Sequence, residues 1–268
     1  MDLLVTTDEL AARAGEPGLV VVDCTYHSLE PDRDAAAEHA EGHVPGAVFL
    51  DLKGLEPDAP DLFAARATAI GLSAAREIVL YDAATHRTAA RGWWLLRYFG
   101  IDTPIRLLDG GFAAWGEDGR PIETGGPAAP GGPPVTPRPQ PALLVDKPAV
   151  LGGVPQLVDA RSAARFTGAE ADPRPQMARG HIPGSVNLPY NRLLAADGRW
   201  RSPEAIRAAF AEVGVDVDRP VTTTCGSGVT ASVLLFGQAL AGGAKGALYN
   251  GSWREWGIDP ATPKAVTA

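Results

Sequence analysis

One order of motifs occurs twice along this chain, and this repeat constrains the fold more than any other feature. The first copy runs VVVDC (20–24), EGHVPGAVFLDL (41–52), EIVLYD (77–82) and DGGFAAWG (109–116). The second runs QLVDA (156–160), RGHIPGSVNLPY (179–190), VTTTC (221–225) and NGSWREWG (250–257). His43 and His181 give the offset, which is 181 − 43 = 138 residues. Solenoid repeats recur roughly every 20 to 50 residues, so this longer offset indicates two duplicated domains.

A stretch rich in proline and glycine separates the two copies. Residues 123–141, ETGGPAAPGGPPVTPRPQP, contain seven prolines, which can continue neither a helix nor a central strand. We therefore predict a first domain at 1–122, a linker at 123–141 and a second domain at 142–268. A chain of 268 residues suits two domains of ordinary size.

Short β-branched runs alternate with helix-like stretches within each copy. The expected strands are 19–22, 78–81 and 105–108 in the first copy and 157–158, 221–224 and 247–249 in the second. Long apolar stretches at 89–99 and 230–240 predict one buried helix in each copy. Such alternation is typical of an α/β fold, in which helices flank a mainly parallel sheet. The fold class is therefore α/β, in two tandem domains.

Local signals also mark several helix ends. Thr6 followed by Glu9 has the pattern of a capping box, and Gly15 follows as a stop. Ser202 and Pro203 predict the start of a later helix that ends by residue 214.

Composition excludes several function classes. The formal net charge is −8, and no block of basic residues could neutralise a phosphate backbone. Nucleic acid and anionic membranes are therefore not expected partners. The first residues carry acids where a signal peptide needs positive charge, and no apolar run reaches the roughly 18 residues of a spanning helix. The expected location is the cytoplasm. Two cysteines cannot form a disulfide framework or a four-ligand metal site.

The loop after the expected strand 221–224 has the features of an anion site. Cys225 ends this strand, and the residues that lead into the next helix are Gly226, Ser227, Gly228, Val229 and Thr230. Backbone amides and the helix dipole converge there and favour a thiolate over a thiol. We expect both glycines to adopt φ values that residues with a Cβ avoid. The pattern indicates a nucleophile, although a small buried cysteine in an ordinary turn remains the alternative. Cys24 lacks such glycines and is expected to be structural.

The motifs together resemble the 3-mercaptopyruvate sulfurtransferases of the tandem-domain rhodanese superfamily. The resemblance rests on CGSGVTA (225–231), both HxPG segments, AARGWWLLRYFG (89–100), DGGFAAW, NGSWREW and DARSAARFTGAEADPRP (159–175). It implies two rhodanese-like domains, of which only the second has a nucleophile. The corresponding turn of the first copy, 82–88, contains no cysteine, as this implies.

The same resemblance implies which residues bind the sulfur donor. Thiosulfate-using relatives resemble CRKGVT, whereas Gly226 and Ser227 are neutral here, which favours a donor with one carboxylate over a doubly charged one. Arg165 and Arg174 match the pair that binds the carboxylate and ketone of the donor, and a planar guanidinium suits that task. The alternatives for each are a solvated surface arginine or one that pairs with the nearby Glu170 or Asp172.

Three further positions match a relay proposed for the family. Ser227, His43 and Asp34 would help a proton to move as the sulfur leaves. The alternative for His43 is a structural role in its turn, and His181 in the second HxPG segment has the same alternative. The segment 81–91 is short and lacks a tyrosine found near the site of relatives, so His86 or Arg87 is a candidate replacement.

The implied reaction is sulfur transfer by double displacement. Cys225 would take sulfur from 3-mercaptopyruvate as a persulfide, release pyruvate, and pass the sulfur to cyanide, a small thiol or a thioredoxin-like protein, with no metal or organic cofactor. Thiosulfate-to-cyanide transfer is the first alternative, and a non-catalytic rhodanese-like binding or regulatory module is the second. A rhodanese-like phosphatase or arsenate reductase is disfavoured, because such an enzyme needs an arginine where Ala231 stands.

Overall fold

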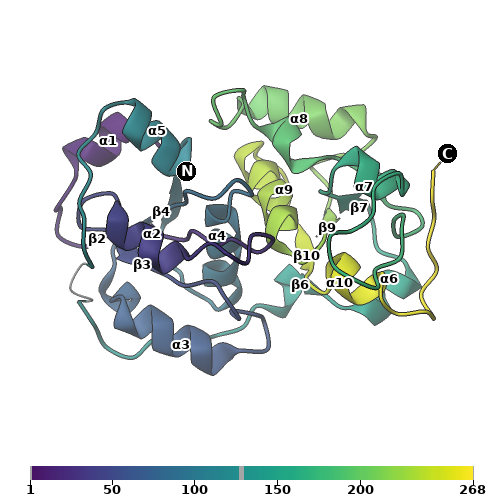
Figure 1. Cartoon of the computed structure of the whole chain (residues 1–268), viewed down its shortest axis with the longest axis horizontal. Helices are drawn as coiled ribbons and strands as arrows, with labels where there is room; N and C mark the ends of the chain where they lie inside the picture. The colour runs from purple at the N-terminus through teal and green to yellow at the C-terminus, as the bar shows by residue number, and fades with distance from the viewer. Residues whose placement is uncertain (1, 127–129, 268) are drawn as a thin grey trace. The chain divides into compact units, whose positions relative to one another are not determined.

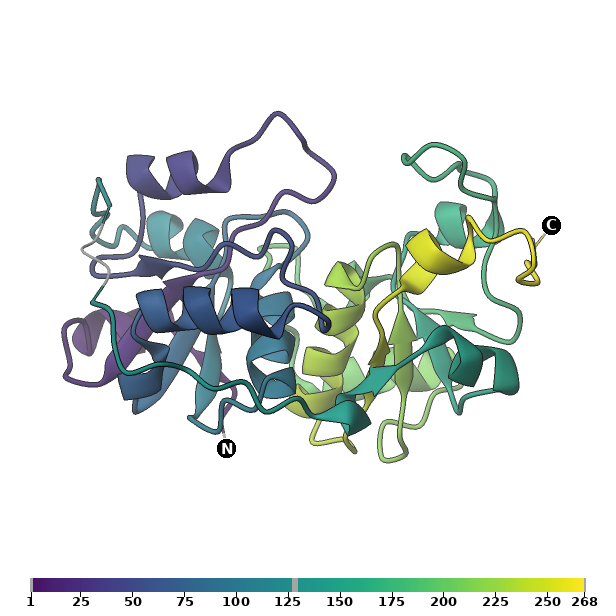
Figure 2. The ribbon, with the colours of Figure 1, turned by 90° about the horizontal axis from the view of Figure 1, so that it is seen from below.

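The chain folds into two compact units, which Figures 1 and 2 show as a computed structural model. The structure describes residues 2–126 and 130–267, so residues 127–129 of the expected linker lie outside the described residues. The first unit comprises Met1–Gln140 and Ala196–Arg199, and the second comprises Pro141–Ala195 and Trp200–Ala268. The four-residue turn 196–199 therefore joins the first unit, although it lies in the second copy of the sequence repeat.

The first unit is built on a parallel sheet in the order β1-β5-β4-β2-β3. Its strands are β1 (Leu4–Val5), β2 (Leu19–Asp23), β3 (Val48–Phe49), β4 (Glu77–Tyr81) and β5 (Ile105–Leu108). Its helices are α1 (Thr7–Ala12), α2 (Ala35–Glu41), α3 (Pro60–Ala69), α4 (Ala89–Tyr98) and α5 (Gly111–Glu117), with the 3₁₀ turn η1 (Leu72–Ala74). The central strands carry nearly continuous apolar runs, because helices pack on the faces of a parallel sheet.

The second unit repeats this topology in the order β6-β10-β9-β7-β8, again parallel. Its strands are β6 (Leu144–Val145), β7 (Leu157–Asp159), β8 (Val186–Asn187), β9 (Thr222–Thr224) and β10 (Ala247–Tyr249). Its helices are α6 (Lys147–Gly152), α7 (Ala163–Thr167), α8 (Pro203–Glu212), α9 (Val229–Leu240) and α10 (Ser252–Trp256), with 3₁₀ turns η2 (Pro141–Leu143) and η3 (Tyr190–Leu193). Two sheets of identical strand order confirm the duplicated α/β fold.

The six strands expected from sequence are confirmed, and β5 and β10 have the expected bounds. The buried helices are confirmed as α4 and α9, and α9 contacts both β9 and β10. The sequence pattern missed β1, β3, β6 and β8. Each of these four strands has two residues, which is too short for any hydrophobic periodicity.

The capping prediction for α1 is half right. Thr6 accepts a hydrogen bond from the amide of Glu9 at 3.1 Å, as an N-cap does. The reciprocal bond is missing, because the Glu9 carboxylate accepts hydrogen bonds from Arg106 instead, and these hydrogen bonds lower the pKa of Glu9. The other predicted start is confirmed, since Ser202 caps α8 by accepting from the amide of Ala205 at 3.2 Å.

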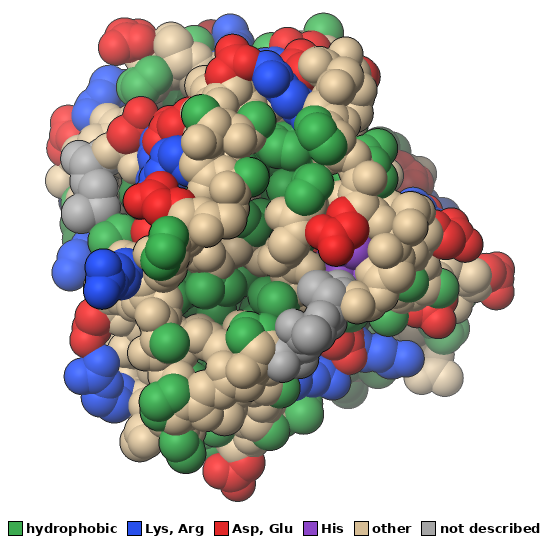
Figure 3. All heavy atoms as spheres, turned by 90° about the vertical axis from the view of Figure 1, so that its left-hand side faces the viewer, with side chains coloured by type: hydrophobic (Ala, Val, Ile, Leu, Met, Phe, Trp, Pro, Cys, Tyr) green, Lys and Arg blue, Asp and Glu red, His purple; other side chains and the backbone are tan. Residues whose placement is uncertain are grey.

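The surface mixes charges of both signs. On the face drawn in Figure 3, acidic and basic side chains lie interspersed around the edge, while hydrophobic side chains gather nearer the middle. Among the helices of residues 2–126 and 130–267, none combines the length and the hydropathy that a membrane span requires.

Two threonines of β9 bury hydroxyl groups that have no hydrogen-bond partner within the described residues. The side chains of Thr223 and Thr224 are 0% and 1% exposed, and the Oγ1 of each is unpaired. A buried hydroxyl without a partner costs free energy. We expect Thr223→Val to raise the free energy of unfolding by about 1 kcal/mol in urea denaturation.

A threonine of the first unit supplies the matched control. Thr88 is equally buried, but its hydroxyl donates to the carbonyl of Cys24 at 2.7 Å. The same replacement, Thr88→Val, removes a formed bond and should lower the free energy of unfolding by about 1 kcal/mol. Changes of the same sign in both variants would contradict this account of the β9 hydroxyls.

Candidate active site

Cys225 lies in the second unit, between the end of β9 and the start of α9, as the sequence predicts. It is 2% exposed, and its Sγ accepts a hydrogen bond from the amide of Gly228 at 3.1 Å. Gly228 is the N-cap of α9 and has a φ of 81°, which strongly favours glycine. The turn therefore directs an amide of the α9 N-terminus at the sulfur, where the helix dipole also favours negative charge.

Fewer backbone amides reach the sulfur of Cys225 than the sequence predicts. Of the amides of residues 226–230, the structure places that of Gly228 within hydrogen-bond distance of Sγ. Val229 and Thr230 form the first turn of α9, and Ser227 is partly buried on the loop. The proposed roles of Ser227, Val229 and Thr230 toward a bound donor stay predictions.

A second set of hydrogen bonds fixes the loop from the side of β10. The amide of Cys225 donates to Ser252 Oγ at 3.3 Å, and the amide of Trp253 donates to the Cys225 carbonyl at 3.0 Å. The amide of Arg254 donates to the Gly226 carbonyl at 2.9 Å. The start of α10 thereby fixes the backbone of Cys225 and Gly226 through hydrogen bonds.

Sequence reasoning missed Ser252, although the repeat contains the signal for it. Ser252 is fully buried with a φ of 53°, and the equivalent position of the first copy is Gly111, with a φ of 63°. A residue with a Cβ rarely adopts this conformation. In the second copy the serine hydroxyl donates to the Tyr249 carbonyl at 2.8 Å and accepts from Cys225, so the side chain forms a link that glycine could not.

Arg165 and Arg174 both lie against the catalytic loop. Arg174 donates from Nη1 to the Gly226 carbonyl at 2.7 Å. A Cβ built on Gly226 would lie 2.7 Å from Arg174 Nη2 and 3.4 Å from Arg165 Nη2. Both guanidiniums therefore lie beside the residue that follows Cys225, and their role toward a donor stays a prediction.

The prediction that Gly226 has an unusual backbone conformation is wrong. Gly226 does not have a positive φ, whereas Gly228 does. A Cβ at Gly226 would lie 2.7 Å from Arg174 Nη2, so a side chain there would force the Arg174 guanidinium to move. The first residue of the loop is thus small so that the arginines can approach, and the third is glycine so that the helix can begin.

Of the alternatives for the two arginines, pairing with Asp172 is observed. Arg165 Nη2 donates to Asp172 Oδ2 at 2.5 Å, and Arg174 donates to both oxygens of Asp172 at 2.8 Å. Pairing with Asp172 is compatible with a role in donor binding, because one carboxylate binds both arginines while both still lie beside the loop.

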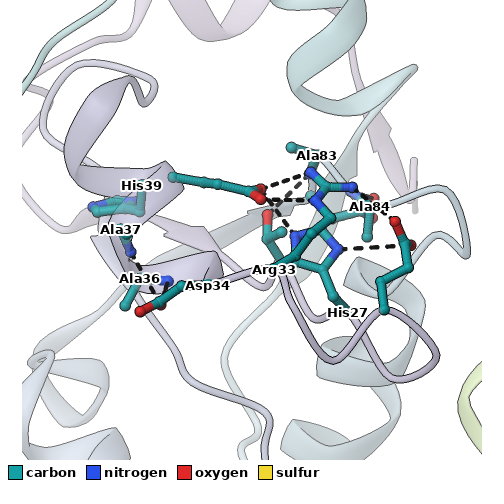
Figure 4. A network of polar contacts seen from close by, with 12 residues as sticks. His27, Arg33, Asp34, Ala36, Ala37, His39, Ala83 and Ala84 are labelled. Carbon is teal, nitrogen blue, oxygen red and sulfur yellow. Dashed lines mark hydrogen bonds and ion pairs between the residues drawn. The ribbon is translucent and has the colours of Figure 1, made fainter.

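His43 and Asp34 belong to the first unit. His43 is fully buried, shares a hydrogen bond of 2.7 Å between its Nδ1 and the His39 carbonyl, and stacks on the His39 ring at 4.1 Å. Asp34 is exposed and caps α2, and Figure 4 shows its carboxylate directed at the amides of Ala36 and Ala37. Each side chain thus has a local structural partner, and the relay with Ser227 stays a prediction. His181 is buried and shares a hydrogen bond with the Phe166 carbonyl, which fits its structural alternative.

The position equivalent to Cys225 in the first unit is Asp82. Asp82 follows β4 as Cys225 follows β9, and its carbonyl accepts from Phe112 as that of Cys225 accepts from Trp253. Its carboxylate accepts hydrogen bonds from the amides of Ala84 at 3.1 Å and Ala89 at 2.8 Å. The first unit therefore directs loop amides at an oxygen anion and has no thiol there. His86 and Arg87 lie in this turn, and their proposed role toward the donor stays a prediction.

Cys24 lies at the end of β2, buried from solvent. Burial raises the pKa of its thiol well above the ordinary value, and the neighbouring Asp23 and Asp82 add to this effect. A Cβ placed on Gly92 would lie 2.6 Å from its Sγ, so the sulfur fills the space against α4. These surroundings fit the structural role expected for Cys24.

Asp82 should make the stability of the protein depend on pH. Burial raises its pKa to about 6, against an ordinary value of about 3.9. Between these pH values the unfolded chain has released the proton while the folded chain keeps it, so stability falls as pH rises. We expect the unfolding free energy of wild type, relative to Asp82→Asn, to fall by about 2 kcal/mol from pH 4 to pH 7. Chemical denaturation of both proteins at each pH measures this, and a difference that does not change with pH would refute it.

Comparison with known families agrees with this geometry. A model of the rhodanese-like domain matches residues 6–118 and, separately, residues 143–259. The two matches cover most of the chain and correspond to the two copies of the repeat. The chain belongs to the rhodanese family. Its tandem organisation is thereby shown.

Individual relatives of the rhodanese family agree in chemistry and differ in donor. The chain is 39% identical over 283 residues to a probable 3-mercaptopyruvate sulfurtransferase of Pseudomonas aeruginosa, covering 98% of each. It is 36% identical over 282 residues to thiosulfate sulfurtransferase of Bos taurus, covering 94% of this chain and 91% of the relative. SseA from Escherichia coli, described as a 3-mercaptopyruvate sulfotransferase with the rhodanese fold, matches with a TM-score of 0.82 and 33% identity over 94% of this chain and 99% of SseA. This rhodanese is therefore a sulfurtransferase, and two of these three relatives are named for 3-mercaptopyruvate.

Proposed function

We propose that this sulfurtransferase takes sulfur from 3-mercaptopyruvate through a persulfide on Cys225 and releases pyruvate. The observation that carries the proposal is the convergence of Arg165 and Arg174 on Gly226, beside the cysteine. Planar guanidiniums suit a carboxylate and an adjacent ketone. The loop itself offers no charged side chain at 226 or 227, so the recognition groups in this proposal are the two arginines that lie beside it.

The chemistry is a double displacement. The Cys225 thiolate attacks the donor sulfur, the carbon–sulfur bond breaks, and its electron pair leaves with pyruvate as the enolate. The enolate takes up a proton, and Cys225 carries the outer sulfur as a persulfide. The Gly228 amide and the N-terminus of α9 would stabilise negative charge on sulfur before and after the transfer. Ser227 would donate a hydrogen bond to the departing enolate.

A thiophilic acceptor completes the cycle. Cyanide, a small thiol or a reduced thioredoxin-like protein would attack the outer sulfur of the persulfide and regenerate the Cys225 thiolate. His43 and Asp34 would assist proton movement in this proposal. Each step uses groups of the chain and the two substrates alone.

Thiosulfate is the second candidate donor, since the bovine relative bears its name. Thiosulfate carries two negative charges and gains more from added cations than does a donor with a single carboxylate. The neutral Gly226 and Ser227 therefore favour mercaptopyruvate.

Intact-protein mass tests the proposal directly. The protein is exposed briefly to 3-mercaptopyruvate or to thiosulfate, and pyruvate is assayed in the first sample. We expect a gain of about 32 Da, one sulfur atom, with mercaptopyruvate. A gain with thiosulfate alone would establish the second donor instead, and no gain with either would favour the non-catalytic binding module.

A further inference from the structure

Asp172 is the charged group nearest to both donor-binding arginines, and the family comparison gives it no role. It lies in the segment after α7, and its side chain is 1% exposed. Its Oδ1 accepts from the backbone amide of Arg174 at 3.0 Å and from Nε of the same residue at 2.8 Å. Its Oδ2 accepts from Arg174 Nη2 at 2.8 Å and from Arg165 Nη2 at 2.5 Å. A single carboxylate therefore fixes both guanidinium groups.

Asp172 does not engage every hydrogen-bond donor of the two arginines. Arg174 directs Nη1, which Asp172 does not engage, at the Gly226 carbonyl. Arg165 uses Nη2 for Asp172, and its Nε is buried without an acceptor among the described residues. The two side chains are 15% and 22% exposed, so they lie in the same sparsely solvated surroundings as the carboxylate.

The carboxylate also sets the charge beside the nucleophile. Two guanidiniums and one carboxylate sum to +2 − 1 = +1 next to Gly226. Burial alone would raise the pKa of Asp172, but hydrogen bonds from Arg174 and Arg165 outweigh it and hold the pKa well below its usual range. Asp172 is therefore ionised wherever the enzyme works, and its negative charge is a fixed part of the site.

We propose that Asp172 is a positioning residue that determines donor specificity, by orienting Arg165 and Arg174 and by reducing their combined charge to match a donor with one carboxylate. The proposal rests on the function proposed above. A dianion such as thiosulfate would gain more than a monoanion from the full charge of two arginines, because the Coulomb energy scales with the charge of the ligand. Asp172 lowers the net positive charge that a dianion would meet, and it keeps both guanidiniums in place for a carboxylate and a ketone.

Steady-state kinetics with both donors tests the idea. In Asp172→Asn the shape is kept and the charge becomes +2, so we expect the ratio of kcat/KM for mercaptopyruvate to that for thiosulfate to fall by about tenfold or more. Asp172→Glu keeps the charge and should retain a ratio closer to that of wild type. A folded Asp172→Asn enzyme with the wild-type ratio would overturn the proposal, since a merely structural carboxylate would lower both activities together.

Asp218 offers a matched control in the same unit. It pairs with Arg207 at 2.7 Å, but its side chain is 62% exposed, and both residues lie outside the loop. Asp218→Asn makes the same change of net charge and should leave the donor ratio within about twofold of wild type, because exposed pairs are screened. A similar shift in both variants would attribute the effect to overall charge and overturn the role of Asp172.

A binding measurement needs no Asp172 variant. Calorimetry on Cys225→Ser compares pyruvate, with one negative charge, and oxalate, with two. We expect oxalate to bind no more tightly than pyruvate, and binding of oxalate more than about tenfold tighter would contradict the charge argument. A failure of the proposed function can be told apart from a failure of the role of Asp172. If the proposed function is wrong, the wild-type protein forms no persulfide with mercaptopyruvate, whichever anion it binds more tightly.

Discussion

Cys225→Ser is expected to lower the rate of sulfur transfer from 3-mercaptopyruvate by about 10⁴-fold, because the persulfide needs a sulfur nucleophile. The serine hydroxyl is nearly isosteric, and the loop is held through backbone groups, namely the Cys225 amide and carbonyl. The fold should therefore persist. Pyruvate release measures turnover, and the intact mass should show no gain of sulfur.

Cys24→Ala provides the control for thiol content. Cys24 is the other cysteine of the chain, and it is completely buried at the end of β2. Its removal should leave the sulfur gain and the turnover at wild-type levels and cost about 1 kcal/mol of stability as a small cavity. If Cys225→Ser still gained sulfur while Cys24→Ala did not, the assignment of the nucleophile would be wrong.

The strand-to-helix turn of each copy could be predicted from sequence, because its signals are local. Apolar β-branched runs, a change of period and a helix-capping glycine lie within about ten residues of Cys225, and β9, Gly228 and α9 follow from them. A β-branched run and a long apolar stretch likewise locate β4 and α4 on either side of Asp82. The two-residue edge strands could not be predicted, because their pairing with β5, β2, β10 and β7 depends on the assembled sheet.

The electrostatic detail of the site depends on contacts that sequence spacing does not specify. The pattern at Thr6 and Glu9 suggested a reciprocal cap, but Arg106, 97 residues away, takes the carboxylate. Gly226 suggested an unusual backbone, but its neighbour across 52 residues, Arg174, makes space the constraint. Long-range pairs of this kind can override a local propensity, because a charged side chain binds the partner that the fold brings near.

A buried ion pair at the end of β7 packs against a residue that binds the Cys225 loop. Arg161 donates from Nε and Nη2 to both oxygens of Asp159 at 2.7 to 3.1 Å, and both side chains are at most 2% exposed. The guanidinium lies 4.5 Å from the ring centroid of Trp253, whose amide binds the Cys225 carbonyl. The pair at the end of β7 thus packs against the residue that holds the nucleophile's backbone.

Asp159→Asn is expected to lower the free energy of unfolding by about 3 to 5 kcal/mol, because it leaves the Arg161 charge buried without its carboxylate. Urea denaturation measures the loss. Asp218→Asn, which breaks the exposed pair with Arg207, should cost less than about 1 kcal/mol. Equal losses in the two variants would show that burial does not govern the strength of these pairs. Since Trp253 packs on Arg161, the loss in Asp159→Asn should also loosen the Cys225 loop, and a fall in persulfide formation below the unfolding transition would reveal it.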